Sequence, residues 1–179
     1  MNIRAVIQTL ILLATTSPTM QLFDFNNDRD LSGWYVVDDG VMGGRSAGNL
    51  EINEDGNGIF FGDVSLENNG GFSSIRYRFE QKNISPHQLC KIRLKGDGKR
   101  YQFRVKTDKY DRHSYIFHFE TSGEWQTIQI PLAEMYPAFR GRKLNMVNYP
   151  AHQLEELSFM IGNKKAESFK LELDWIELE

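Results

Sequence analysis

The sequence predicts an all-β fold, a β-sandwich of jelly-roll type, and three observations carry that prediction. Apolar and polar residues alternate with a period of two through most of the chain, as in strands with one buried face. Helical periodicity is limited to short turns expected at 132–135 and 151–155. The 179 residues are 40% hydrophobic and 25% charged, which suits a globular domain with its own core. We therefore expect residues 21–179 to form one jelly-roll domain.

Several segments show the strand alternation clearly: 75–79, 90–94, 101–105, 115–119, 128–130 and 169–173. Gly96 and Gly98 separate the second of these from the third and predict a hairpin between them. Residues 133–149 contain or adjoin several prolines and are interpreted as a long ordered loop. Cys90 and Trp175 are in phase with their apolar neighbours, so both side chains are expected in the core.

The first twenty residues have the layout of a secretory signal peptide. Arg4 is their only charge, an apolar run covers 5–14, and small residues follow it. The run is about half of the roughly 20 residues that cross a bilayer, so no permanent membrane anchor is expected. An amphipathic or buried N-terminal segment is the alternative. Export predicts a periplasmic or secreted location, with a cytoplasmic location as the alternative.

Composition and spacing exclude several classes of function. A net charge of -3, without a recognition helix or a stacking motif, gives no reason to expect nucleic acid as a partner. One cysteine and four unclustered histidines provide no zinc site. The stretch that begins at Asp24 lacks the glycine and the final glutamate of an EF-hand, although a structural calcium on Asp24, Asp28 or Asp30 stays open. We expect no cofactor and assign no metal ligand.

Two glycine-rich stretches, 34–46 and 61–72, are the most distinctive parts of the sequence. Glycines permit backbone angles or close approaches that other residues resist, so both stretches are expected to form ordered loops at one end of the sandwich. A carboxylate and an arginine are suited to bridging such loops. The candidate binding residues here are Asp38, Asp39, Met42, Ser46, Ser65, Asn68 and Arg76.

The paired acids do not predict catalysis. Neighbours on a strand point to opposite faces, so Asp38 and Asp39 are not expected to face each other as an acid–base pair. We interpret them as loop-fixing acceptors of backbone N–H groups, with catalysis as the weaker alternative. Ser46 and Ser65 lie in no nucleophile motif. The sequence therefore predicts a protein that is not an enzyme.

Positive charge is concentrated in residues 91–112, which hold nine basic and three acidic residues. One interpretation is that these are the solvated faces of strands. The other is that a polar concave sheet binds an anionic or sugar ligand through Arg93, Gln102, Arg104 and His118.

The glycine-rich stretches resemble the signature of the complex I intermediate-associated protein 30 family. The resemblance extends to 96–101, Trp125, 130–132, 139–141 and 174–176, and it adds Arg140 to the binding candidates. It implies a galactose-binding-like jelly roll, and in eukaryotes the family is tied to the chaperoned assembly of respiratory complex I. The expectation is a non-catalytic binding or assembly-factor module whose partner is a protein, such as a respiratory-complex subunit, or a glycan. The alternative is a carbohydrate-binding module acting outside the cytoplasm.

Overall fold

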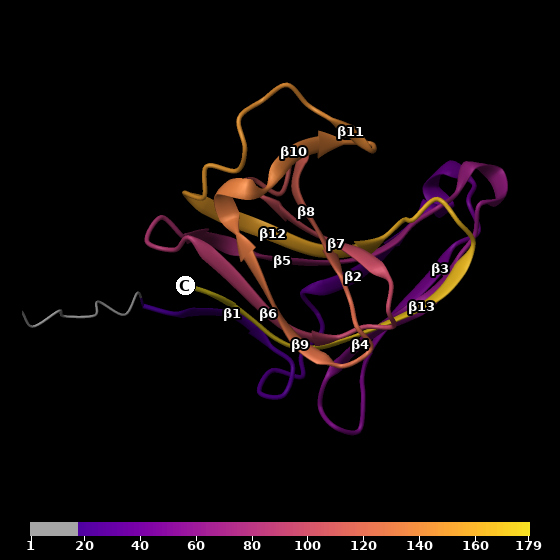
Figure 1. Ribbon diagram of the computed structural model, residues 1–179, viewed down its shortest axis with the longest axis horizontal. Coiled ribbons are helices and arrows are strands. Elements are labelled where there is room, and N and C mark those ends of the chain that lie inside the picture. Colours follow the sequence, from indigo (N-terminus) through magenta and orange to yellow (C-terminus); the bar gives the residue numbers. More distant parts are fainter. Residues whose placement is uncertain (1–17) are drawn as a thin grey trace, which may run out of the picture.

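The computed structural model describes residues 18–179, which form two antiparallel β-sheets packed face to face (Figure 1). In this part of the chain the strands are β1 Met20–Asp24, β2 Trp34–Asp38, β3 Ala47–Ile52, β4 Gly58–Val64, β5 Ser73–Asn83, β6 Leu89–Lys95, β7 Arg100–Lys106, β8 Ser114–Glu120, β9 Trp125–Pro131, β10 Tyr136–Phe139, β11 Arg142–Lys143, β12 Gln153–Ile161 and β13 Glu167–Leu178. Three short 3-10 helices, η1 Asp39–Met42, η2 Glu67–Asn69 and η3 Leu132–Glu134, lie between strands. The predicted all-β sandwich is confirmed.

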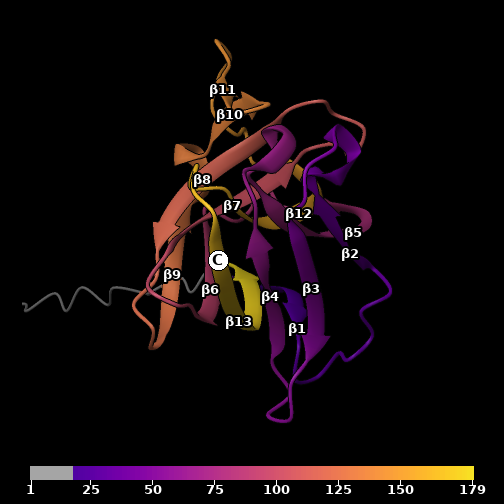
Figure 2. The ribbon, with the colours of Figure 1, turned by 90° about the vertical axis from the view of Figure 1, so that its right-hand side faces the viewer.

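The sheets contain six and seven strands within the described residues. The first has the order β3-β4-β13-β6-β9, with β1 also paired to β13, and the second has the order β11-β10-β8-β7-β12-β5-β2. Figure 2 shows the two layers from the side, with the β10–β11 hairpin projecting beyond the seven-stranded sheet. The outer face of that sheet is therefore bordered by the hairpin at one side.

The core lies between the two inner faces and is rich in aromatic side chains. Phe60 of β4 contacts Phe169 of β13 with ring centroids 4.7 Å apart, and Phe103 and Phe159 are 5.4 Å apart on neighbouring strands. Cys90 is buried in the same core, as expected. Because alternate residues of β7 enter this core, the residues between them are directed to the outer face.

The predicted hairpin at Gly96 and Gly98 is wrong. β6 pairs with β13 and β9, whereas β7 pairs with β12 and β8, so the glycine segment crosses from one sheet to the other. A Cβ at Gly96 would collide with Thr121, which explains a glycine at the crossing. Alternation identified both strands, but it carries no information on their pairing partners.

The segment expected as a loop at 133–149 contains the β10–β11 hairpin. Its turn is formed by Arg140 and Gly141, whose φ angles of 48° and 74° lie in the left-handed region. The short turn expected at 132–135 is present as η3, but the one expected at 151–155 is replaced by the start of β12. Prolines misled the interpretation, because Pro137 is accommodated within a short strand near the sheet edge.

Trp175 is not in the core, and a β-bulge is the reason. The pairing of β13 with β6 shifts between Leu173 and Trp175, which inserts Asp174 and reverses the alternation. Ile176 is therefore fully buried, while Trp175 is only half-buried.

The predicted signal peptide falls mainly on residues 1–17, which lie outside the described residues. β1 begins at Met20, where it pairs with Leu178 of the last strand. Residues 18–179 contain no helix that is both long and apolar enough to cross a membrane.

Candidate functional site: a cationic groove on the seven-stranded sheet

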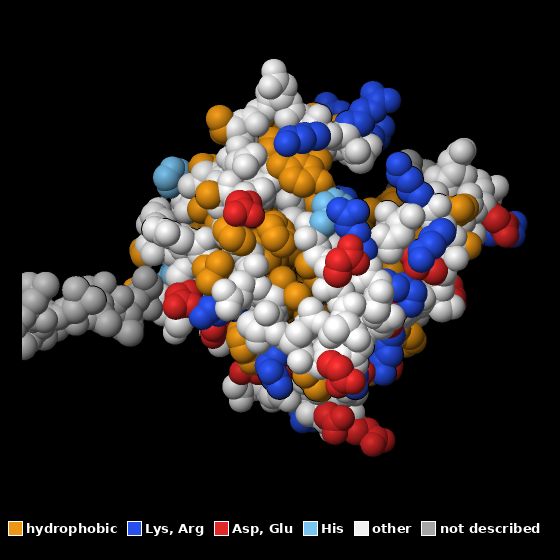
Figure 3. Space-filling view, viewed as in Figure 1, with side chains coloured by type: hydrophobic (Ala, Val, Ile, Leu, Met, Phe, Trp, Pro, Cys, Tyr) orange, Lys and Arg blue, Asp and Glu red, His pale blue; other side chains and the backbone are white. Residues whose placement is uncertain are grey.

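A groove of about 980 Å³ lies on the outer face of the seven-stranded sheet. We call it the cationic groove, because six of its lining residues are Lys or Arg. Among the described residues, no Asp or Glu lines it. Figure 3 shows the molecule hollowed between the β10–β11 hairpin and the loops of η1 and η2, with Lys and Arg side chains on both sides. The basic lining residues are Arg76, Arg104, Lys106, Arg112, Arg140 and Lys164.

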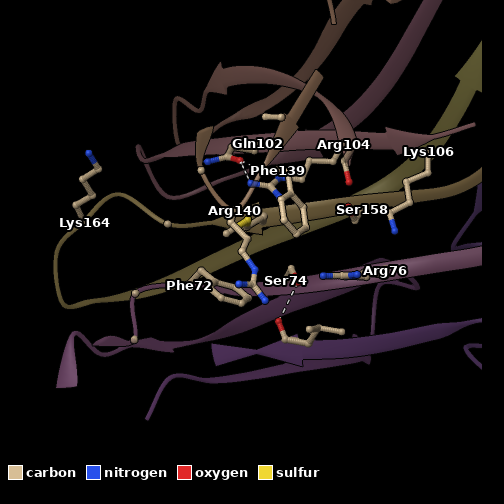
Figure 4. A pocket seen from close by; sticks show the side chains of 18 of the residues that line it. Phe72, Ser74, Arg76, Gln102, Arg104, Lys106, Phe139, Arg140, Ser158 and Lys164 are labelled. Atoms are coloured by element: carbon tan, nitrogen blue, oxygen red, sulfur yellow. Dashed lines mark hydrogen bonds between the residues drawn. The ribbon is translucent and has the colours of Figure 1, made fainter. Parts of the chain in front are cut away.

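Strand register brings the basic residues of the floor together. Ser158 of β12 lies opposite Arg76 of β5 on one side and opposite Arg104 of β7 on the other. Adjacent strands are about 4.8 Å apart, so two arginines rise from the sheet on either side of one small residue. Figure 4 shows both guanidinium groups at the floor of the groove.

Arg104 is oriented by a neutral partner. Gln102 Oε1 accepts hydrogen bonds from Arg104 Nε at 2.9 Å and from Nη2 at 2.5 Å. Burial, together with the nearby Arg76 charge, lowers the pKa of Arg104 to about 10. The guanidinium therefore remains protonated at neutral pH, and its charge is not cancelled by its hydrogen-bond partner.

Glu156 is a buried carboxylate beside the groove, and several cations converge on it. Arg78 Nε donates to Glu156 Oε2 at 2.6 Å, and the Tyr35 hydroxyl donates to the same oxygen at 3.0 Å. Arg76 and Lys106 each lie 3.8 Å from Oε1. Burial and the Glu156 charge raise the pKa of Tyr35 to about 12, so it stays a donor. One negative charge thus faces three positive ones.

Two further cations lie at the rim: Arg140 in the turn of the β10–β11 hairpin and Arg112 in the segment between β7 and β8. The Arg112 and Arg140 guanidinium groups lie 5.0 and 5.4 Å from the centroid of the Phe139 ring, within the range of cation–π attraction. Arg140 points into the groove in Figure 4, from a turn that fixes its backbone. Phe139 therefore helps to hold two exposed cations above the floor.

Asp39 joins the two glycine-rich loops, and residues of these loops, not Asp39 itself, line the opposite side of the groove. Its carboxylate accepts hydrogen bonds from Ser46 N at 3.1 Å and Ser46 Oγ at 2.5 Å, and from Gly71 N at 2.6 Å and Phe72 N at 3.2 Å. Burial would raise the pKa of Asp39, but these hydrogen bonds outweigh it and hold the pKa below its ordinary value. These hydrogen bonds agree with the expected role of Asp39 in fixing the loops.

Three other predicted loop residues, Ser46, Ser65 and Asp38, form hydrogen bonds at these loops. Ser46 Oγ accepts a hydrogen bond from Ser65 N at 3.0 Å, and Asp38 Oδ2 accepts one from Gly48 N at 3.0 Å. Asn68 is exposed, with a left-handed φ of 54°.

Met42 and Arg76 are the remaining candidates from the glycine-rich loops and their neighbouring strand. Met42 ends η1, but its side chain lies outside the described part of the structure. Arg76 does not bridge the loops as expected, because the register of β5 directs it to Glu156.

Three of the four residues expected on one polar face, Gln102, Arg104 and His118, lie on the seven-stranded sheet, and their role in binding stays a prediction. Gln102 and Arg104 line the groove, and His118 lies opposite Gln102 on β8, with Nε2 2.9 Å from the Tyr136 hydroxyl. Arg93 is on the six-stranded sheet and pairs with Asp174 at 3.0 Å, so its assignment to this face is wrong.

Sequence reasoning missed Lys106, Arg112, Lys164 and Phe139. Lys106 continues the alternation of Gln102 and Arg104 and was recognisable from it. Arg112 and Lys164 lie in connecting segments, where no periodicity locates a side chain.

Within residues 18–179 no group of three or more His, Cys, Asp or Glu side chains is arranged to hold a metal ion. Asp24, Asp28 and Asp30 instead accept hydrogen bonds from groups two or three residues along the chain. This acidic segment is a series of Asx turns.

Comparison with known proteins identifies related sequences. The sequence pattern of the Complex I intermediate-associated protein 30 family matches residues 23–173. A relative from Drosophila melanogaster, "Complex I intermediate-associated protein 30, mitochondrial", is 25% identical over 194 residues, covering 94% of this chain and 66% of its own length. The Mus musculus relative of the same description is 24% identical over 179 residues, covering 87% and 54%. The chain thus spans less than two thirds of each relative.

These relatives correct the expected location. Both are described as mitochondrial, which contradicts the prediction of a periplasmic or secreted protein. The prediction rested on residues 1–20 alone, and a short apolar segment with one basic residue is weak evidence of destination.

Solved structures share the fold at low sequence identity. A Family 11 carbohydrate-binding module from Clostridium thermocellum, in complex with a mixed-linked tetrasaccharide, has a TM-score of 0.66 at 16% identity, covering 89% of this chain and 94% of the module. The adhesin domain K1 of Lys-gingipain from Porphyromonas gingivalis has a TM-score of 0.52 at 12% identity, covering 90% and 98%. The likeness confirms the jelly-roll class. Because the family pattern spans most of the sequence, the chain belongs to the complex I intermediate-associated protein 30 family.

Proposed function

We propose that the protein is a non-catalytic binding module that serves in the assembly of respiratory complex I by holding a protein partner in the cationic groove. Family membership supports the assembly role, and the two relatives carry complex I in their names. The observation that carries the proposal is a large groove lined by six cations and, in the described residues, by no carboxylate.

The state of the buried acids supports a binding role over a catalytic one. The Asp39 carboxylate accepts four hydrogen bonds from the two loops that it joins. Glu156 is surrounded by Arg76, Arg78, Lys106 and the Tyr35 hydroxyl. A general base needs free access to the proton that it removes, and both carboxylates have their oxygens engaged by the protein.

The test is removal of the protein from the cell that makes it, followed by separation of complex I and its intermediates on native gels. We expect loss of mature complex I, with restoration by the wild-type chain and by Arg93→Gln, which removes one arginine charge from the other sheet. The double variant Arg104→Gln/Arg140→Asn should fail to restore it. Normal complex I in cells without the protein would overturn the proposal.

A further inference from the structure

We infer that the cationic groove binds an extended acidic polypeptide segment, with its carboxylates on Arg104 and Arg140 and its apolar side chains against Phe72 and Met160. The inference rests on the proposed function only in taking the partner to be a protein. It names the chemistry by which the groove would recognise that partner.

Four of the six cations that line the groove have no carboxylate partner within the described residues. Among the ion pairs of residues 18–179, Arg104, Arg112, Arg140 and Lys164 take no part, whereas Arg76 and Lys106 share Glu156. Arg104 spends Nε and one N–H of Nη2 on the neutral Gln102. Its remaining N–H groups are available for a carboxylate, which an arginine binds with two parallel hydrogen bonds.

Charged and apolar side chains are interleaved in the lining of the groove. Val37, Leu66, Phe72, Phe139 and Met160 line the same groove as the six cations. Side chains on one face of an extended peptide recur about every 7 Å, so acidic and apolar residues can meet both kinds of surface. A nucleic acid or a uronic acid polymer would supply the charge but no aliphatic side chains. A protein segment can contact both the cationic and the apolar side chains of this lining, whereas those polymers would contact mainly the cations.

The shape of the groove and the net charge of the chain both favour a short protein segment over a bilayer or a long polyanion. The floor lies below the rim formed by the β10–β11 hairpin and the η1 and η2 loops (Figure 3), so a flat bilayer would not reach Arg76 or Arg104. The whole chain carries a net charge of -3, so a long polyanion leaving the groove would meet net repulsion. A single extended segment that ends within the groove avoids this.

The test is fluorescence anisotropy with a labelled peptide of about ten residues in which Glu and Leu alternate with Gly spacers. Matched peptides with Gln or Lys in place of Glu report the charge requirement, and oligogalacturonate, inorganic phosphate and single-stranded DNA serve as competing anions. The protein variants are Arg104→Gln, Arg104→Lys and Arg140→Asn, with Arg93→Gln as the control of equal charge change. Asn tolerates the left-handed backbone of residue 140, so the hairpin should be retained.

We expect the Glu peptide alone to bind, with affinity falling as salt rises. Arg104→Gln and Arg140→Asn should each weaken it about tenfold, which is the loss of one charge-assisted contact. Arg104→Lys should recover only part of the affinity, because the paired hydrogen bonds are lost. Arg93→Gln should bind as the wild type does. Thermal unfolding of each variant establishes that it is folded.

Three results would overturn the inference: equal binding of the Gln peptide, stronger binding of the polysaccharide or DNA than of the Glu peptide, or unchanged affinity in both arginine variants. The two proposals fail separately. Loss of complex I in cells without the protein, combined with no peptide binding, rejects the acidic segment and keeps the assembly role. Peptide binding that is weakened by the arginine variants, combined with normal complex I in cells without the protein, rejects the assembly role and retains the proposal that the groove binds an acidic segment.

Discussion

The Arg104 guanidinium is held in place by Gln102, which accepts two hydrogen bonds from it at 2.9 and 2.5 Å. A glutamate would give the same geometry and would also cancel the charge, as Glu156 does for Arg78 at 2.6 Å. The seven-stranded sheet thus contains two arginines in different states. Arg104 is oriented by a neutral amide, whereas Arg78 is paired with a carboxylate. This contrast makes the role of charge at Arg104 directly testable.

Gln102→Glu should weaken binding of the acidic peptide while leaving the fold intact. The new carboxylate would pair with Arg104, so the groove would lose one effective positive charge and its free arginine. We expect a loss of about tenfold in affinity, the size of one charge-assisted contact. The matched control is Gln129→Glu, an exposed position on the other sheet with the same change in net charge. Tighter binding by Gln102→Glu would contradict the assignment.

Because of the bulge in β13, a polar substitution should be far more destabilising at Ile176 than at the adjacent Trp175. Ile176 is fully buried, and an unpaired amide in its place costs about 2 kcal/mol or more besides the lost packing. Trp175 is half-buried on the outer face, where an amide remains in contact with water. Ile176→Gln should therefore melt at least about 6 °C below Trp175→Gln, since 1 kcal/mol corresponds to roughly 2 to 4 °C in a chain of this size. Equal melting temperatures would mean that the bulge is misplaced.

Local periodicity predicted most strands, because alternation is a property of a few consecutive residues. It placed Gln102 and Arg104 on one face and identified the buried positions of β6 and β7. It could not show that these two strands belong to different sheets, since pairing depends on residues far apart in the chain. That one error put Arg93 on the wrong face.

Long-range pairing also explains why the position of Arg76 in the groove could not be predicted. Arg76 was expected at the glycine-rich loops, but pairing of β5 with β12 brings it to Glu156, eighty residues away in sequence. Phe139 and Arg140 were expected in a long ordered loop, because prolines masked a short hairpin. A contact between side chains far apart in the sequence leaves no periodic pattern in the residues around either of them.

Cys90 should be unreactive in the folded protein. It is the only cysteine of the chain and is fully buried, and burial raises the pKa of its thiol well above the ordinary value. Labelling with a thiol-reactive dye at pH 8 should therefore be slow in buffer and fast in denaturant, so that its rate reports unfolding. Rapid labelling of the native protein would place Cys90 at an accessible site.

Asp39 should be a large contributor to stability at neutral pH. Its ionised carboxylate accepts four hydrogen bonds that join the two glycine-rich loops, and a Cβ at Gly44 would collide with it. Asp39→Asn removes the charge and leaves buried donors poorly paired, so we expect a loss of about 3 kcal/mol in the free energy of unfolding. Asp38→Asn is the matched control. Its carboxylate accepts one backbone hydrogen bond, from Gly48 N, so we expect a loss of about 1 kcal/mol in the free energy of unfolding.

The pH dependence separates this charge effect from a change of shape. The pKa of Asp39 is depressed in the folded protein, so its stabilisation is complete above the unfolded pKa of about 3.9 and declines as pH falls towards the folded pKa. The stability difference between wild type and Asp39→Asn should therefore be constant from neutral pH to about pH 5 and shrink below about pH 4. Denaturant unfolding of both proteins across this range measures it. A difference that does not change with pH would show that the ionised carboxylate is not what holds the loops together.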